Sequence, residues 1–370
     1  MARARDQDAC PGALQVHRAA DGALARVRLP GGMIAPDQLE ALAHAATRFG
    51  SPAMELTSRG NIQIRGITDT AALADAVAAA GLLPSATHER VRNLVASPLS
   101  GRVGGCADVR ELVRRLDAAI CAEPELANLP GRFWVGIDDG RGDVSGMAPD
   151  LGVHASGGSF AVLLAGSDTG VRSAPGDVVD TLVSIARRFV EIRDMAWRVA
   201  ELADPSTLVA GLLRSVEPGT TWPPASRPPV GWIGQDDGRI TLGAAVPLGV
   251  LQARVAEYLA ATEAPIVITP WRSVLVCDLE DGVADTALRV LAPMGLVFDA
   301  NSPWLDVSAC TGSPGCQHSA ADVRADAAKA VREHSAGRRH FVGCERACGS
   351  PSSGEVLIAT GDGYQRRLRS

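Results

Sequence analysis

Four cysteines near the C-terminal end have the spacing and the neighbours of a metal-binding site. Cys310 and Cys316 are separated by five residues and Cys344 and Cys348 by three, with a longer segment between the two pairs. Glycine and proline flank both pairs, so the backbone can turn tightly around a bulky centre and offer N–H groups to the sulfur atoms. Apolar residues at helical spacing predict one helix over 319–334, between the pairs.

Three kinds of centre compete for these thiols. Structural zinc sites use pairs separated by two to four residues, which the first pair does not match. Disulfides require an oxidising compartment, and nothing in the sequence indicates one. A 4Fe–4S cluster fits the spacing best, so Cys310, Cys316, Cys344 and Cys348 are its predicted ligands. The remaining cysteines lie far apart and are expected to be ordinary thiols: Cys10, Cys106, Cys121 and Cys277.

The composition limits the class of protein. The 370 residues are 46% hydrophobic and 21% charged, which allows two or three domains with large cores. A net charge of −6 argues against a nucleic-acid partner. No apolar run reaches the ~18 residues of a membrane helix, so no membrane partner is expected. The polar start predicts a disordered tail over 1–15, and the expected location is the cytoplasm.

The stretch 54–66 is the most informative part of the chain upstream of the cysteines. If it is extended, alternate side chains lie on opposite faces. One face is apolar, and the other carries hydrogen-bond donors and two cations, which suits a large anionic ligand. A solvent-facing edge strand is the alternative. The polar face would consist of Thr57, Arg59, Asn61, Gln63 and Arg65.

The pattern of the first 85 residues returns later in the chain. The segment 217–231 carries five prolines and no hydrophobic period, which is typical of a linker. After it come a predicted strand over 239–244, a helix over 251–261 and a strand pair over 266–276. This repetition predicts two copies of one β-α-β unit packed about a pseudo-twofold axis. The second copy lacks the Asn and Gln of the first.

These features resemble the nitrite and sulfite reductase superfamily over nearly the whole chain. Its first-repeat motif corresponds to Thr57, Arg59 and Gln63, and its Arg-Asn motif to Arg92 and Asn93. The resemblance implies that these residues, with Asn61 and Arg132, grip the carboxylates of a tetrapyrrole. It implies an α+β fold with a duplicated architecture: two ferredoxin-like half-domains and two α/β segments, the C-terminal one carrying the cluster. The expected boundaries are 1–15 for the tail, 16–85 for the first half-domain, 88–215 for the first α/β segment, which lacks cluster ligands, 217–231 for the linker, 232–299 for the second half-domain and 300–370 for the segment that binds the 4Fe–4S cluster.

One loop departs from the reductases. They place two basic residues, one residue apart, where this chain has Arg132 and Trp134. A reductase must hold a small oxyanion, which several converging cations do well, so the loss of one cation weakens that interpretation. Within the superfamily the chain looks most like the precorrin-3B synthases, because of its short length, its sequence over 268–273 (Ile-Thr-Pro-Trp-Arg-Ser) and the form of its last cysteine pair.

The resemblance to the precorrin-3B synthases implies a specific reaction. They are monooxygenases of cobalamin (vitamin B12) biosynthesis, which hydroxylate precorrin-3A, an anionic tetrapyrrole, with O2 and close a γ-lactone. The implied cofactors are a 4Fe–4S cluster and a mononuclear non-haem iron, for which no histidine spacing reveals ligands. The implied electron donor is an NADH-linked reductase or a ferredoxin-like protein. The alternatives are a siroheme-dependent assimilatory sulfite or nitrite reductase, and an iron–sulfur protein that binds a tetrapyrrole or carries electrons without turnover.

Overall fold

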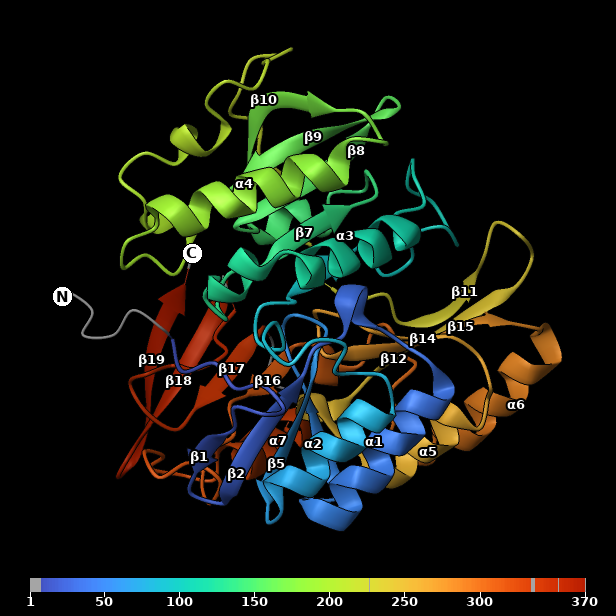
Figure 1. The fold of residues 1–370 in the computed structure, drawn as a ribbon. Coiled ribbons are helices and arrows are strands. Elements are labelled where there is room, and N and C mark those ends of the chain that lie inside the picture. The colour runs from blue at the N-terminus through green and yellow to red at the C-terminus, as the bar shows by residue number, and fades with distance from the viewer. Residues whose placement is uncertain (1–7, 226, 334–336, 352, 370) are drawn as a thin grey trace.

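The computed structural model describes residues 8–225, 227–333, 337–351 and 353–369, which form four β-sheets with flanking helices (Figure 1). Two of the sheets belong to the predicted half-domains and two to the predicted α/β segments. Within the described residues, no helix is both long enough and apolar enough to span a membrane.

The first half-domain is a sheet with two helices on one face. Helix α1 begins at a proline, whose missing N–H is not needed there, and ends at Gly50. Helix α2 begins where the Asp69 carboxylate accepts the N–H of Ala72. The elements are β1 (His17–Ala19), β2 (Gly22–Val27), β3 (Met33–Ile34), α1 (Pro36–Phe49), β4 (Ala53–Leu56), β5 (Ile62–Ile67) and α2 (Thr70–Ala79).

The second half-domain repeats this order, as the sequence predicts. Its helices α5 and α6 continue the helical layer begun by α1 and α2 (Figure 1). The elements are β11 (Gly231–Gly234), β12 (Ile240–Ala245), β13 (Val250–Gln252), α5 (Ala253–Ala260), β14 (Ile266–Ile268), β15 (Ser273–Leu279) and α6 (Asp281–Leu291).

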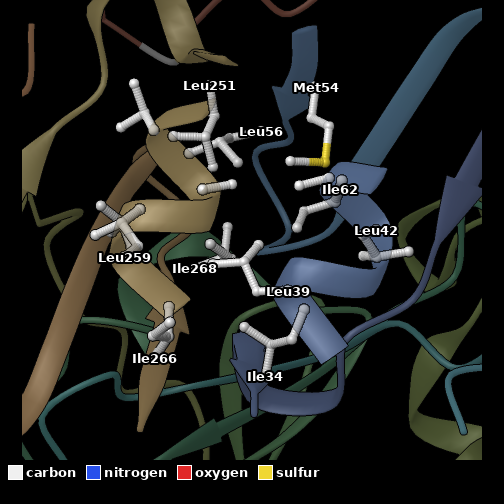
Figure 2. Close-up of a cluster of buried hydrophobic side chains, with 14 of the residues drawn as sticks. Ile34, Leu39, Leu42, Met54, Leu56, Ile62, Leu251, Leu259, Ile266 and Ile268 are labelled. Carbon is white, nitrogen blue, oxygen red and sulfur yellow. The ribbon is translucent and has the colours of Figure 1, made fainter. Parts of the chain in front are cut away.

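The two half-domains exchange one short strand each. The sheet orders are β1-β2-β5-β4-β13 and β11-β12-β15-β14-β3, so each half-domain completes the other's sheet. Ile34 pairs with Ile266, and Val250 pairs with Glu55. The two copies therefore share one hydrophobic core. Figure 2 shows side chains of both copies meeting in it, among them Ile34, Leu39, Leu42, Leu259, Ile266 and Ile268.

The two α/β segments also follow one path. Each has three parallel strands, with a helix between the first and the second, and then antiparallel strands at the edge. The first consists of β6 (Leu94–Ala96), α3 (Arg110–Ala122), β7 (Val135–Asp138), β8 (Leu151–Ser156), β9 (Ser159–Leu164), β10 (Ser167–Ser173) and α4 (Val178–Ile192). The second consists of β16 (Val307–Ala309), α7 (Val323–Arg332), β17 (Arg339–Val342), β18 (Gly354–Thr360) and β19 (Gly363–Arg369).

Two local predictions are wrong in detail. The helix expected over 319–334 begins later, at Val323, because the Asp322 carboxylate accepts the N–H of Ala325 and starts the helix there. Its expected end at 334 lies outside the described residues. The stretch 54–66 is a hairpin and not one extended strand, since Thr57 donates its N–H to the Asn61 carbonyl across a turn.

The strand exchange predicts an unusual sensitivity at Gly32. Gly32 has φ +71°, and a Cβ there would lie 2.0 Å from the carbonyl oxygen of Ile268 in the other copy. Gly32→Ala should lower the free energy of unfolding by about 3 kcal/mol or more, because backbone must move. Gly238→Ala is the matched control: it has φ +86° and open space, so it should cost only about 1–2 kcal/mol. Thermal unfolding of both variants checks this, and equal losses would contradict the close contact.

Candidate functional site

The four predicted cluster ligands come together at the ends of two parallel strands. Cys310 follows β16 and Cys344 follows β17. Gly343 donates its N–H to Cys310 Sγ at 3.3 Å, the kind of contact that stabilises a thiolate. Burial raises the pKa of the Cys348 thiol, and the nearby thiols of Cys310, Cys344 and Cys316 raise it further. Four thiolates this close need a positively charged centre to hold them.

The separation of the thiols discriminates between the possible centres. A zinc ion with four thiolates at ~2.3 Å would place its sulfur atoms ~3.8 Å apart. Among the described residues, one group of three His, Cys, Asp or Glu ligand atoms lies within 4.8 Å of one another, and it consists of aspartates. No three of the four thiols therefore come that close to one another. All eight cysteines are free, which excludes a disulfide here. The four thiols therefore stand farther apart than one tetrahedral zinc ion would hold them.

A histidine that the spacing analysis did not single out supports the ligand loops. His340 on β17 is fully buried, and its ring nitrogens lie 2.8 Å from Ser308 Oγ and 3.0 Å from the carbonyl oxygen of Cys348. It therefore links β16, β17 and the last ligand. No metal-ligand spacing could have revealed this role, because it depends on strands that become neighbours only in the fold.

The predicted polar face of the first half-domain is confirmed along β5. Ile62 and Ile64 lie in the hydrophobic core, whereas Gln63 and Arg65 lie on the opposite face. Gln63 accepts a hydrogen bond from Arg26 at 2.8 Å and donates one to Glu55 at 2.7 Å. The polar face is thus a connected network rather than a solvated edge.

Arg59 lies in the β4–β5 turn and reaches the loop before β7. Its guanidinium donates to the carbonyl oxygens of Gly131 at 3.1 Å and Arg132 at 2.7 Å. Burial lowers the pKa of Arg59 to about 10. The guanidinium of Arg132 lies over the ring of Trp197, 5.2 Å from its centroid. The Arg59 side chain is therefore in direct contact with the backbone of Arg132.

The two asparagines of the site act as scaffolding. Asn61 accepts the N–H of Leu29 at 2.9 Å, and Asn93 donates to the carbonyl oxygens of Gly131 at 2.9 Å and Phe133 at 3.1 Å. Both asparagines are 1% exposed, so their amides are enclosed by protein. They fix the backbone on which the arginines stand.

Arg92 does not join the other arginines. Its guanidinium forms a two-pronged pair with Asp117 on α3, at 2.8 and 2.7 Å. The resemblance places Arg92 with Arg59 because it gives their two motifs the same role, that of gripping the carboxylates of a tetrapyrrole. The structure directs the Arg92 side chain towards the helix instead, so its first role is to support α3.

The sequence analysis missed two buried arginines at the end of β2. Arg28 is 2% exposed and donates to the carbonyl oxygen of Arg90 at 3.1 Å, while its Nε has no partner among the described residues. Burial lowers the pKa of Arg28 well below its usual range, and the charges of Arg26 and Arg59 lower it further. The alternation of Arg26 and Arg28 along a strand was a signal that could have revealed them.

The prediction of a disordered tail is wrong for residues 8–15, which form an N-terminal strap across the site. Residues 1–7 lie outside the described part of the chain. Glu89 accepts the N–H groups of 13, 14 and 15 at 2.6–2.8 Å. The Asp8 carboxylate accepts the N–H of Arg132 at 2.7 Å and pairs with Arg90 at 3.3 Å. Charged groups inside the fold, which a local composition argument does not see, hold the strap in place.

A cavity of about 350 Å³ separates the first sheet from the cysteine loop. Arg65 closes one side: it pairs with Asp21 at 2.8 Å and donates to the carbonyl oxygen of Gly315 at 2.7 Å, one residue before Cys316. Arg324 on α7 pairs with Glu55 on β4 across the same gap. The lining includes Asp21, Glu55, Arg65, Thr311, Ser313 and Arg324.

Phe133 and Trp134 point to opposite faces, as alternation along the strand predicts. Phe133 stacks on Phe189 with ring centroids 4.9 Å apart, and Trp134 packs in a separate apolar cluster with Val95 and Val144. Trp134 is 5% exposed. The place that the reductases give to a second cation is therefore filled by an interior side chain.

In the first α/β segment, aspartates occupy the place that cysteines occupy in the second. Asp138, at the end of β7, accepts four backbone N–H groups, from 140, 142, 144 and 145. Asp139 pairs with Arg141 at 2.6 Å, and burial raises the pKa of Asp143 to about 6. This aspartate group contains no histidine, and the chain's own donors satisfy it. His154 lies beside the group, with its Nδ1 3.3 Å from Asp138 Oδ1. In the described part of the chain, the three ligand atoms that lie within 4.8 Å of one another include no histidine, so this group is not the two-histidine, one-carboxylate set expected for the second iron.

Comparisons with known proteins agree with this architecture. The family described as "Nitrite/Sulfite reductase ferredoxin-like half domain" matches residues 16–80. The NirA protein of Mycobacterium tuberculosis superposes with a TM-score of 0.77 at 19% identity, covering 94% of this chain and 74% of that one. The chain has the nitrite/sulfite reductase-like fold.

Two curated relatives carry different activities. A precorrin-3B synthase from Sinorhizobium sp is 27% identical over 96% of this chain and 81% of its own length. A ferredoxin–nitrite reductase from Synechococcus elongatus is 24% identical over 90% of this chain and 75% of its own length. The predicted resemblance to the superfamily is thereby confirmed, but the two relatives are named for different reactions.

The cysteine site generates the first functional prediction. Serine cannot replace a thiolate on soft iron without loss of the cluster, so each change at 310, 316, 344 or 348 should lower iron and sulfide content and abolish turnover. The same change at Cys106 or Cys121 is the control and should leave iron content near normal. Iron and sulfide analysis of purified protein measures this; intact clusters in two of the four ligand variants would contradict the ligand assignment.

The arginine geometry generates a second prediction, which ranks two residues. Arg59→Ala should weaken binding of a polycarboxylate tetrapyrrole by roughly 1.5–3 kcal/mol, about one to two decades, with unchanged cluster content. Arg92→Ala should cost less affinity but lower the melting temperature, because it leaves Asp117 unpaired against α3. Fluorescence titration and thermal unfolding separate the two effects. Equal affinity losses would return Arg92 to the binding site.

Proposed function

We propose that this chain is an oxidoreductase of the precorrin-3B synthase type, which hydroxylates an anionic tetrapyrrole with O2. The observation that carries the proposal is the gathering of four thiols in loops that Arg65 of the first sheet contacts through the Gly315 carbonyl oxygen, beside a cavity. The relative that bears this name is similar over almost the whole chain, which supports the proposal.

The substrate would be held through its carboxylates. Arg28 is buried, and the half-buried Arg26 and Arg59 lie close to it. Loss of hydration lowers the pKa of each guanidinium, and the charges of Arg26 and Arg59 lower that of Arg28 further. Carboxylates of the ligand would compensate this charge with two-pronged hydrogen bonds. Arg132, held by Asp8 through its own N–H, would add a further cation at the rim.

The cofactor assignment follows from the ligand chemistry. Cys310, Cys316, Cys344 and Cys348 would hold a 4Fe–4S cluster, which supplies electrons one at a time when bound. One oxygen atom of O2 would enter the substrate, and the other would leave as water with two electrons and two protons from an external donor. The donor would be a ferredoxin-like protein or an NADH-linked reductase. We assign no residue and no step to a second iron.

The chain's own residues would shape the site rather than carry redox chemistry. The β5 network fixes the arginines, and the strap of residues 8–15 covers the loop at Arg132. Trp134 and its apolar neighbours exclude a second cation from this loop. A drier pocket with fewer converging cations suits neutral O2 better than sulfite or nitrite.

The second candidate is a siroheme-dependent nitrite or sulfite reductase. The similarity to a nitrite reductase over 90% of the chain favours it. In that case the tetrapyrrole would be a prosthetic group, and the purified protein would show strong macrocycle absorption. The missing second cation beside Arg132 is the observation against it.

The oxygen requirement tests the proposed reaction. Given precorrin-3A and an electron source, the enzyme should turn over only with O2, and one atom from 18O2 should appear in the product by mass spectrometry. The anaerobically reduced enzyme should not consume sulfite or nitrite. Turnover without oxygen, or reduction of sulfite at a useful rate, would establish the reductase instead.

A further inference from the structure

We propose that Arg272 sets the electrostatic potential at the cysteine site and favours the reduced form of the cluster that these cysteines hold. The inference rests on the proposed 4Fe–4S cluster and adds a residue that the arginine face does not contain. Arg272 lies in the second half-domain, in the turn between β14 and β15.

The pseudo-symmetry of the two half-domains shows how unusual this residue is. Thr57 donates its N–H to Asn61 across the β4–β5 turn at 2.9 Å, and Thr269 donates to Ser273 across the β14–β15 turn at the same distance. The fourth residue of the turn is Gly60 in one copy, with φ +67°, and arginine in the other, with φ +59°. A left-handed backbone strains a residue that has a Cβ, whereas glycine adopts it freely. The second copy carries this strain where the first avoids it.

The side chain of Arg272 follows a path that two glycines leave open. A Cβ on Gly249 would lie 2.9 Å from Arg272 Cδ, and a Cβ on Gly349 would lie 2.8 Å from Arg272 Nη2. Gly349 directly follows the ligand Cys348. The guanidinium therefore packs against the backbone of the last ligand loop, and larger residues at either glycine would block it.

The charges around Arg272 leave its positive charge directed at the cysteines. Burial lowers the pKa of Arg272; Glu55 and the Cys310 thiol oppose this shift, and Arg324 adds to it. Glu55 is already bound by Arg324 and by Gln63. Among the described residues, no carboxylate or carbonyl group accepts a hydrogen bond from the Arg272 side chain. Besides Glu55, the thiol site is thus a negative centre that this cation meets, because the guanidinium packs against Gly349, next to Cys348.

A cation in this position has a definite physical effect. A cluster bound by four thiolates carries net negative charge, which increases by one unit on reduction. Coulomb attraction to a nearby buried cation grows with that charge, so the cation stabilises the reduced cluster more than the oxidised one. Arg272 therefore should raise the reduction potential. The turn alone does not explain an arginine here, because glycine would adopt the left-handed backbone without strain.

The test separates the effect of the Arg272 charge from the effect of its backbone strain. Arg272→Gly removes both, Arg272→Gln removes the charge and keeps the length, and Arg272→Lys keeps the charge. The cluster's reduction potential, followed by electron paramagnetic resonance during a redox titration, should shift to more negative values in the Gly and Gln variants and stay near wild type in the Lys variant. The Gly variant should melt at the wild-type temperature or above it, since the strain is relieved.

Glu263→Gly is the matched control, because Glu263 is exposed and also has a left-handed backbone, with φ +55°. It should leave the potential unchanged. The proposal fails if the Gln variant, with full iron content, keeps the wild-type potential, or if the Lys variant shifts as far as Gln. If the Gly variant binds little cluster, the comparison of the Gln and Lys variants still shows whether the charge sets the reduction potential. A wild-type protein without any cluster would instead reject the proposed function.

Discussion

Buried positive charge that the chain does not neutralise is the constraint on which the site depends. Burying a guanidinium group is costly unless it is paired and hydrogen-bonded. Among the described residues the Nε of Arg28 has no hydrogen-bond partner, and the charges of Arg26 and Arg59 lower the pKa of this guanidinium further. The surrounding structure must therefore be rigid enough to hold these groups together. The asparagine scaffolding, the β5 network and the N-terminal strap all serve this purpose, and an anionic ligand would complete the balance.

The duplicated architecture divides two tasks between equivalent positions. In both α/β segments, loops follow the first and second of three parallel strands, and such strand ends are common places for ligands. In the first segment, aspartates with backbone donors and Arg141 fill this place and make it rigid. In the second, thiols fill it and leave room for a larger centre. One backbone path thus supports a structural network in one copy and the proposed metal site in the other.

Local patterns in the sequence predicted much of the fold and part of the candidate site. The features that depend on contacts between distant segments could not be predicted in this way. The alternation of Gln63 with Ile62 and Ile64 is a local signal, and it correctly predicted the two faces of β5. The cysteine spacing is also a local signal, and the proposed cluster rests on it. The direction of the Arg92 side chain depends on Asp117, which lies on a separate helix. The strap depends on Glu89, and the significance of Arg272 depends on a glycine beside Cys348. Pairings of this kind become visible only when distant segments are neighbours in space.

The exchange of β3 and β13 has a consequence for how the chain reaches its native state. As the protein is synthesised, the first sheet emerges without its edge strand, because Val250–Gln252 follows much later, and Met33–Ile34 waits for β14. Contacts so distant in sequence form slowly, and an unpaired strand edge can pair with other chains meanwhile. Neither half-domain is therefore a separable folding unit. The nascent chain must remain protected until the second copy has left the ribosome, and the two copies then close as one cooperative body.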